Sequence, residues 1–139
     1  MLNYKLFELN NIDSGKGNLV VIENEKNQIP FDIKRLFYIS GCNDDTVRGK
    51  HSNRNSEFIF ICISGSCRIK LDDTNEAYDF LLDKPTKALY IDKLIWKEMY
   101  DFSKDAVLLV LSNNLYDEEE YIYDYNKLKN IMKIESASK

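Results

Sequence analysis

The sequence predicts an all-β sandwich or barrel that ends in one short helix. Many short β-type runs are separated by turn-forming residues, two of these runs are almost wholly apolar, and a helical spacing of apolar residues occurs only near the C-terminus. The 139 residues correspond to the size of one domain, so we expect a single domain over residues 1–139.

The first predicted strands lie at residues 19–23 (LVVIE), after the turn-forming residues 13–17, and at residues 31–39 (FDIKRLFYI), after Pro30. Side chains alternate across a strand, so the second run has one predominantly apolar face. The residues on that face are Phe31, Ile33, Arg35, Phe37 and Ile39.

Two runs are apolar enough to be buried on both faces, residues 58–63 (FIFICI) and 106–111 (AVLLVL). The former ends at the turn Ser64-Gly65-Ser66. Four further runs, at residues 68–71, 78–82, 88–91 and 96–102, lie between the two. The close spacing of these apolar runs, with no helical pattern between them, indicates an antiparallel sandwich or barrel.

The C-terminal segment has the features of a helix. Asp124 can cap its first turn, and Leu128, Ile131 and Met132 then fall on one face. We therefore expect a helix over about residues 124–133.

Composition excludes several classes of partner. Hydrophobic residues make up 44% and charged residues 30%, which is typical of a globular protein, and the formal charge is −4. Lysines and arginines are scattered among acids, whereas a nucleic-acid binder needs a clustered basic surface. The longest apolar run is too short to span a membrane. Three cysteines without a CxxC pair, and the lack of an export signal, predict a cytoplasmic protein.

His51 is the one histidine of the chain, and it lies between Arg48 and Arg54, just before the apolar run at 58–63. A histidine on a surface loop would have no chemical role. The neighbouring arginines favour a functional group instead, because guanidinium forks bind anions and a base needs a rigid support. We predict that His51 is an acid/base and that Arg48 binds an anionic group.

Other kinds of chemistry lack support in the sequence. With a single imidazole, only Asn53 and Glu57 could complete a metal site near His51, which would be weak and dominated by oxygen ligands. No nucleophile motif or phosphate-binding glycine loop occurs. The sequence thus predicts a site that needs no metal and no cofactor.

Aromatic residues offer further candidates. Trp96 and Tyr100 could flank a base or a sugar, although packing in the core explains them equally well. Tyr38 lies on the opposite strand face from Phe37 and could face either a pocket or the surface.

Several segments, in order along about residues 13–130, resemble the nucleotide-sugar 3,4-ketoisomerases of the cupin superfamily, the WxcM-like sugar isomerases. The segments that carry this resemblance are residues 30–35 (PFDIKR), 48–51 (RGKH), 63–66 (ISGS), 72–73 (DD), 96–103 (WKEMYDFS), 108–111 (LLVL), 116–118 (YDE) and 121–122 (YI). The resemblance implies a cupin jelly-roll β-sandwich, a homodimer, and conversion of dTDP-4-keto-6-deoxyglucose to a 3-keto sugar. That product would serve the synthesis of 3-amino-3,6-dideoxysugars for lipopolysaccharide or other glycans.

The family motif contains a second histidine where this chain has Asn53. Asparagine donates and accepts hydrogen bonds but does not exchange a proton near neutral pH. We therefore expect His51 to carry the proton through an enediol, with Asn53 or Tyr38 bonding the oxygens. Arg48, and more weakly Arg35, would bind the pyrophosphate, and Trp96 and Tyr100 the thymine or the sugar. The alternatives are a non-catalytic nucleotide-sugar-binding cupin and a related sugar epimerase.

Overall fold

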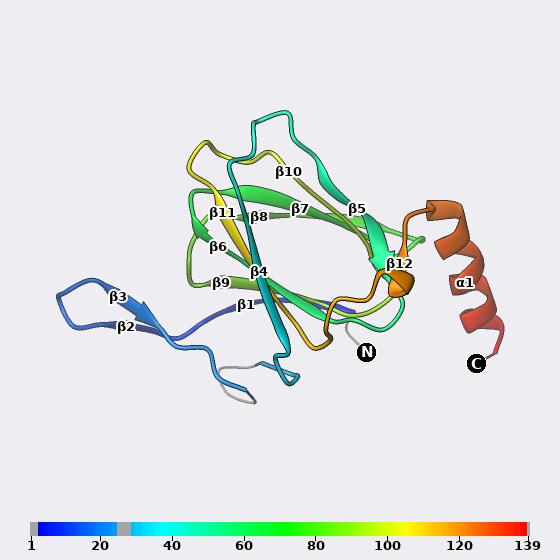
Figure 1. Ribbon diagram of the computed structural model, residues 1–139, viewed down its shortest axis with the longest axis horizontal. Coiled ribbons are helices and arrows are strands. Elements are labelled where there is room, and N and C mark those ends of the chain that lie inside the picture. Colours follow the sequence, from blue (N-terminus) through cyan, green and yellow to red (C-terminus); the bar gives the residue numbers. More distant parts are fainter. Residues whose placement is uncertain (1–2, 25–28, 139) are drawn as a thin grey trace.

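Two five-stranded antiparallel sheets face each other in the computed structural model, which describes residues 3–24 and 29–138 (Figure 1). The first sheet has the order β1 (Tyr4–Glu8), β9 (Lys87–Ile91), β6 (Phe58–Ser64), β11 (Val107–Ser112), β4 (Arg35–Ser40). The second has the order β12 (Tyr121–Ile122), β5 (Arg48–Asn53), β10 (Trp96–Tyr100), β7 (Cys67–Asp72), β8 (Ala77–Leu82). The predicted all-β sandwich with a terminal helix is confirmed.

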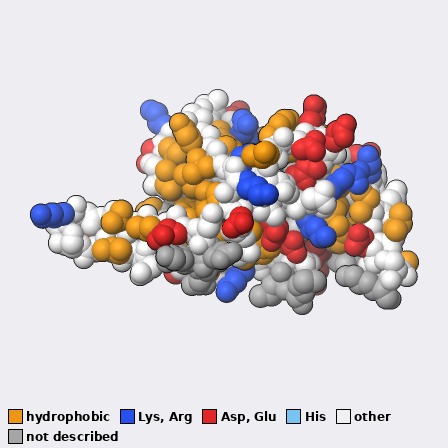
Figure 2. Space-filling model, turned by 60° about the horizontal axis from the view of Figure 1, so that its bottom comes forward, with side chains coloured by type: hydrophobic (Ala, Val, Ile, Leu, Met, Phe, Trp, Pro, Cys, Tyr) orange, Lys and Arg blue, Asp and Glu red, His pale blue; other side chains and the backbone are white. Residues whose placement is uncertain are grey.

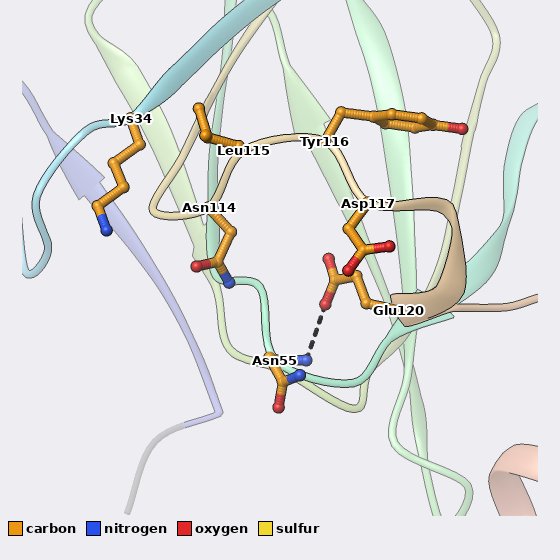
Figure 3. Close-up of a pocket in the computed structure, with 7 residues that line it drawn as sticks. All are labelled: Lys34, Asn55, Asn114, Leu115, Tyr116, Asp117 and Glu120. Carbon is orange, nitrogen blue, oxygen red and sulfur yellow. Dashed lines mark hydrogen bonds between the residues drawn. The ribbon is translucent and has the colours of Figure 1, made fainter.

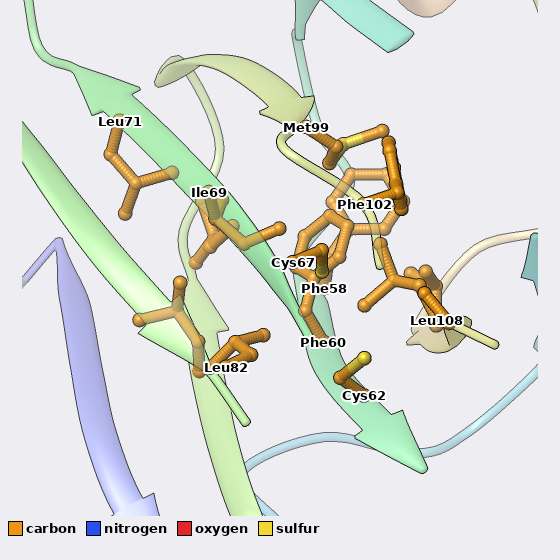
Figure 4. Close-up of a cluster of buried hydrophobic side chains, with 14 of the residues drawn as sticks. Phe58, Phe60, Cys62, Cys67, Ile69, Leu71, Leu82, Met99, Phe102 and Leu108 are labelled. Atoms are coloured by element: carbon orange, nitrogen blue, oxygen red, sulfur yellow. The ribbon is translucent and has the colours of Figure 1, made fainter. Parts of the chain in front are cut away.

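The main core lies between the two sheets (Figure 4). Alternate residues of β6 and β7 face each other there, and all of them are buried: Phe58, Phe60, Cys62, Cys67, Ile69 and Leu71. Burial of these side chains removes apolar surface from water, which is the main stabilising term of a β-sandwich.

The outer face of β6 is buried too. Ile59 and Ile61 are at most 1% exposed and pack against Phe7, Leu9 and Phe31 from the N-terminal segment. This second cluster explains why residues 58–62 are apolar at every position, whereas Ile63 is exposed. A short hairpin of β2 (Asn11–Asp13) and β3 (Asn18–Val20) projects beyond the body on this side (Figure 1).

Helix α1 (Tyr125–Ala137) begins after Asp124, whose carboxylate accepts hydrogen bonds from the backbone N–H of Asn126 and Lys127. It ends four residues later than predicted. Leu128 is fully buried and packs with Trp96 and Ile122. No helix among residues 3–24 and 29–138 is long and apolar enough to cross a membrane.

Some predicted boundaries were wrong. Residues 31–34 are not part of a strand, and β4 begins only at Arg35. Residues 48–53 form β5, although polar side chains made this segment resemble a loop. β5 is a strand because its backbone pairs with both β10 and β12.

Candidate active site

A β-bulge in β5 determines which way two side chains point, those of His51, the predicted base, and Arg48, the predicted anion-binding residue. Opposite β10, Lys97 pairs with His51 and Met99 pairs with Arg48, so Lys50 is an extra residue in the ladder. Without the bulge, two side chains three residues apart would point to opposite faces of the sheet. With it, Arg48 and His51 face the same interior.

Gly49 makes the bulge possible. Its φ is +84°, and a Cβ atom there would lie 2.8 Å from the carbonyl oxygen of Lys97. Lys50 follows with φ +57°. Only glycine combines this backbone conformation with so close an approach to the neighbouring strand.

A Gly49→Ala variant should therefore be destabilised more than a Gly15→Ala variant. Gly15 has φ +83° and open space around it, so alanine there incurs only the cost of the left-handed conformation, about 1–2 kcal/mol. Gly49→Ala adds the clash with β10. Urea unfolding of both variants measures the difference, and equal losses would contradict this account of the bulge.

The interior cavity has a volume of about 180 Å³. It opens between the two sheets at their β4, β5 and β12 ends, and its walls are partly apolar and partly cationic. The lining residues are Phe37, Ile39, Arg48, Gly49, His51, Phe58, Phe60, Lys97, Met99 and Tyr121. The predicted pair His51 and Arg48 thus shares one cavity.

His51 is held in the neutral form. Burial, and after it the positive charge of Lys97, lower its pKa from 6.5 to about 3, although Asn53 and Glu120 act in the opposite direction. Its Nδ1 atom is buried and has no hydrogen-bond partner among the described residues. Its ring packs edge-on against Tyr121, with centroids 4.9 Å apart. His51 is therefore a neutral imidazole at neutral pH.

Lys97 projects into the same cavity from β10 and is 2% exposed. Its Nζ donates a hydrogen bond to Oδ1 of Asn53 at 2.7 Å and lies 4.6 Å from the centroid of the Phe58 ring. Burial lowers the pKa of Lys97 to about 7, with Arg35 contributing repulsion and Glu120 attraction. Such a lysine exchanges a proton near neutral pH.

Glu120 lies on the other side of Asn53 from Lys97 and accepts several hydrogen bonds. Its carboxylate accepts hydrogen bonds from Nδ2 of Asn53 at 2.8 Å and from the backbone N–H and the hydroxyl of Ser56. It also accepts one from the backbone N–H of Asn55 (Figure 3). Burial favours the protonated form, but these donors together keep the pKa of Glu120 below its usual value. Glu120 also borders an outer pocket of about 390 Å³. A chain of hydrogen bonds therefore joins Glu120, Asn53 and Lys97.

Asn53 differs from its predicted role. It is 1% exposed, and its amide already bonds Lys97 on one side and Glu120 on the other. We had expected it to bond the reacting oxygens directly. In the structure its amide group is instead engaged by these two side chains.

Arg35 lies beside the cavity with unused donors. Its Nη1 donates to the Tyr121 hydroxyl at 3.3 Å, whereas Nε and Nη2 are buried without partners among the described residues. The guanidinium also stacks over the rings of Phe37 and Phe58, at 5.5 and 5.9 Å from the centroids. An anionic ligand would satisfy the two free donors.

Three predicted site residues lie elsewhere. Tyr38 is 66% exposed on the outer face of β4, because strand alternation turns it away from Phe37 and the cavity. Trp96 packs against Tyr125 beneath α1, and Tyr100 bonds Asp79 on the outer side of β10. The structure therefore does not bring these three residues into the cavity with His51.

Sequence reasoning missed Lys97, Glu120 and Tyr121. The signal for Lys97 was available, because in β10 it shares a face with Met99, opposite the face of Trp96 and Tyr100. Glu120 lies in an acidic run that resembles a solvated turn. Its burial depends on contacts with residues more than 60 positions earlier in the chain.

Fold and cavity together define a cupin-type β-sandwich with a small-molecule site between its sheets. The chain belongs to the family described as WxcM-like, C-terminal (FdtA), which matches residues 2–133. This family assignment agrees with the resemblance seen in the sequence.

Individual relatives are similar over almost the whole chain. A TDP-4-oxo-6-deoxy-alpha-D-glucose-3,4-oxoisomerase from Aneurinibacillus thermoaerophilus is 42% identical over 90% of this chain and 89% of its own. The TDP-fucose-3,4-ketoisomerase WlaRA from Campylobacter jejuni is 50% identical, with a TM-score of 0.86 over 91% of this chain and 93% of its own. The sugar 3,4-ketoisomerase QdtA from Thermoanaerobacterium thermosaccharolyticum, solved with TDP, is 38% identical, with a TM-score of 0.92 over 96% of both chains.

Proposed function

We propose that this protein is a nucleotide-sugar 3,4-ketoisomerase that converts dTDP-4-keto-6-deoxyglucose to a dTDP-3-keto-6-deoxyhexose. The observation that carries the proposal is the neutral His51, whose buried Nδ1 atom has no hydrogen-bond partner among the described residues, in a cavity that also holds cationic side chains. A neutral imidazole accepts a proton from carbon, and nearby cations stabilise the oxyanion that forms. The substrate is the one in the name of the Aneurinibacillus relative, and 3,4-ketoisomerisation is the activity in the names of all three relatives described above.

The chemistry follows from the carbonyl at C4, which acidifies the hydrogen on C3. His51 removes that hydrogen, an enediol forms, and a proton returned to C4 leaves the carbonyl at C3. Neither an electron nor a group is transferred, so the reaction balances without a redox cofactor or a metal. The described residues contain no cluster of three or more histidine, cysteine or acidic side chains suited to a metal ion.

One assay tests the function. Purified protein is incubated with dTDP-4-keto-6-deoxyglucose in deuterated water while C3 and C4 are followed by NMR. A 3-keto product with deuterium at C4 supports the proposal. Deuterium at C3 with a retained 4-keto group would indicate an epimerase, and binding without exchange a non-catalytic cupin.

Arg48 should serve binding more than chemistry. It is exposed at the rim of the cavity and can hold a pyrophosphate through two parallel hydrogen bonds, a contact that is similar in ground and transition states. Arg48→Ala should raise KM about tenfold or more while kcat changes little. Arg68→Ala is the control, because Arg68 pairs with Asp79 on the outer side of the second sheet. A defect in kcat alone would show that Arg48 acts in the chemical step.

We also propose that the protein acts as a homodimer. Large hydrophobic side chains are exposed on the hairpin and on the outer face of the first sheet: Ile12, Leu19, Leu36, Tyr38 and Ile63. Figure 2 shows hydrophobic side chains along the projecting hairpin. A groove of about 630 Å³ lies between the hairpin and the sheet, bordered by Val20, Ile61 and Leu109. A second copy would remove this surface from water.

Light scattering at micromolar concentration should therefore give twice the mass of one chain. Ile12→Lys together with Leu19→Lys should shift the protein toward the monomer, because charge would then enter the interface. A monomeric wild-type protein would contradict this proposal.

The proposed working unit is a single cupin domain in a reducing cytoplasm. Cys42, Cys62 and Cys67 are free thiols, and Cys62 and Cys67 interact as hydrogen-bonding partners. Free thiols at such close range are characteristic of proteins from a reducing compartment. A dTDP-sugar is the proposed small-molecule partner, and the 3-keto product would accept an amino group in glycan synthesis.

A further inference from the structure

The proposed isomerisation moves two protons, and His51 accounts for only one of them. The substrate carries a hydrogen and a hydroxyl on C3 and a carbonyl on C4; in the product this arrangement is reversed. One proton therefore passes from C3 to C4, and another passes from the oxygen on C3 to the oxygen on C4. A base that faces carbon is poorly placed for the second transfer, because oxygens and carbon-bound hydrogens point in different directions.

We propose that Lys97 is the second proton-transferring residue of this site and moves the oxygen-bound proton while His51 moves the carbon-bound one. This inference rests on the proposed function. It is carried by the position of Lys97, which pairs directly with His51 across β10 and β5 and lines the same cavity. Side chains directly opposite each other on one face of a sheet lie close enough to act on adjacent atoms of one ligand.

The surroundings of Lys97 leave it free to donate. Nζ has three donor sites, and one hydrogen bond, to Asn53, occupies it among the described residues. Among the described residues, no carboxylate forms an ion pair with Nζ of Lys97. Glu120 is connected to Nζ by hydrogen bonds only through Asn53. The charged or titratable groups facing Lys97 are Arg35 from β4, His51 from β5 and Glu120 from η1 (Glu118–Glu120).

The two transfers balance and help each other. As His51 takes the C3 hydrogen, the Lys97 ammonium gives a proton to O4, which forms the neutral enediol. The Lys97 amine then takes the proton of O3 while His51 returns a proton to C4, so both residues regain their starting states. The charge of Lys97 lowers the pKa of His51. Once Lys97 has given up its proton this repulsion disappears, and His51 holds the carbon-derived proton more readily.

The pKa of Lys97, about 7, fits this cycle because the residue must act as acid and then as base at one pH. Arginine at this position would keep the charge but would not release a proton near neutral pH. Lys97→Arg therefore keeps the positive charge at this position but removes proton transfer.

The test follows exchange at C3 and formation of the 3-keto product in deuterated water, for wild type, Lys97→Arg and Lys97→Met. In Lys97→Arg we expect C3 exchange within about threefold of wild type, product formation at least tenfold slower, and loss of the wild-type pH dependence near pH 7. Lys97→Met should lose both activities. Lys104→Met, a change on the exposed loop after β10, should lose neither. Wild-type product formation by Lys97→Arg, or equal loss of both activities in the arginine and methionine variants, would overturn the proposal.

A second variant covers the case in which Lys97→Arg does not fold. Lys97→Ala leaves space that a small amine can enter, and ethylamine should restore product formation at least tenfold. Tetramethylammonium, which has no transferable proton, should restore nothing. Absence of rescue by ethylamine would contradict the role of Lys97, provided that the wild-type protein isomerises. A wild-type protein that neither exchanges nor isomerises would overturn the proposed function, and this inference with it.

Discussion

A His51→Asn variant should lose isomerisation and C3 exchange by a factor on the order of 10² or more, the usual contribution of a general acid/base. His51 is the one imidazole of the chain, it lines the cavity, and its Nδ1 atom is buried without a hydrogen-bond partner among the described residues. Asparagine offers hydrogen bonds but accepts no proton at neutral pH. Rates of deuterium incorporation and product formation, measured by NMR, give the two losses separately.

The fold should survive this substitution. The side chain of His51 contacts Tyr121 and Tyr123 at the edge of the cavity but is not part of the main core. A melting temperature close to that of wild type would show this. Tyr100→Phe is the activity control, since Tyr100 lies on the outer side of the same pair of strands. Wild-type exchange in His51→Asn would place the base on another residue and refute the mechanism.

Replacing Glu120 with alanine should have the largest effect on stability, a loss of about 3–5 kcal/mol. The substitution removes the acceptor of four donors: the buried Nδ2 of Asn53, the buried backbone N–H and hydroxyl of Ser56, and the partly buried backbone N–H of Asn55. Denaturant unfolding measures the loss. Glu119→Ala is the matched control, because Glu119 is exposed in the same turn. A loss below about 1 kcal/mol would show that water readily replaces the carboxylate.

Glu120 also makes stability depend on pH in a defined direction. Its folded-state pKa lies below its unfolded value, so its contribution is complete above about pH 4.5 and is lost as pH falls through the folded-state pKa. His51 adds a dependence of the same sign between about pH 6.5 and 3, because the unfolded imidazole binds a proton there and the folded one does not. Each group contributes at most about 1.4 kcal/mol per pH unit. Glu120→Gln should remove only the lower part of this dependence.

The sandwich was predictable because its signals are local. Runs such as residues 58–63 and 106–111 contain apolar side chains at nearly every position, and turn residues mark where they end. The site was predictable in part for the same reason: His51 and Arg48 lie within four residues of each other, beside a glycine and a buried strand.

The remainder of the site depends on tertiary contacts that no local pattern shows. Alternation divides residues 96–100 into two faces but does not say which face is inside. Helix α1, from the far end of the chain, covers Trp96 and leaves the other face, with Lys97, to the cavity. Glu120 looked solvated because its donors come from residues 53–56, which are distant in sequence.

The bulge in β5 also bears on how length variation in this strand should be interpreted. His51 comes three positions after Arg48, but one of these positions is the extra residue of the bulge. The two side chains therefore lie on the same side of the sheet, as residues two positions apart do in a regular strand. A chain one residue shorter here would present the same two side chains from a regular strand, with no left-handed backbone. Deletion of Lys50 would therefore keep Arg48 and His51 on the same side of the sheet. A single methyl group added at Gly49 would instead force β5 away from β10.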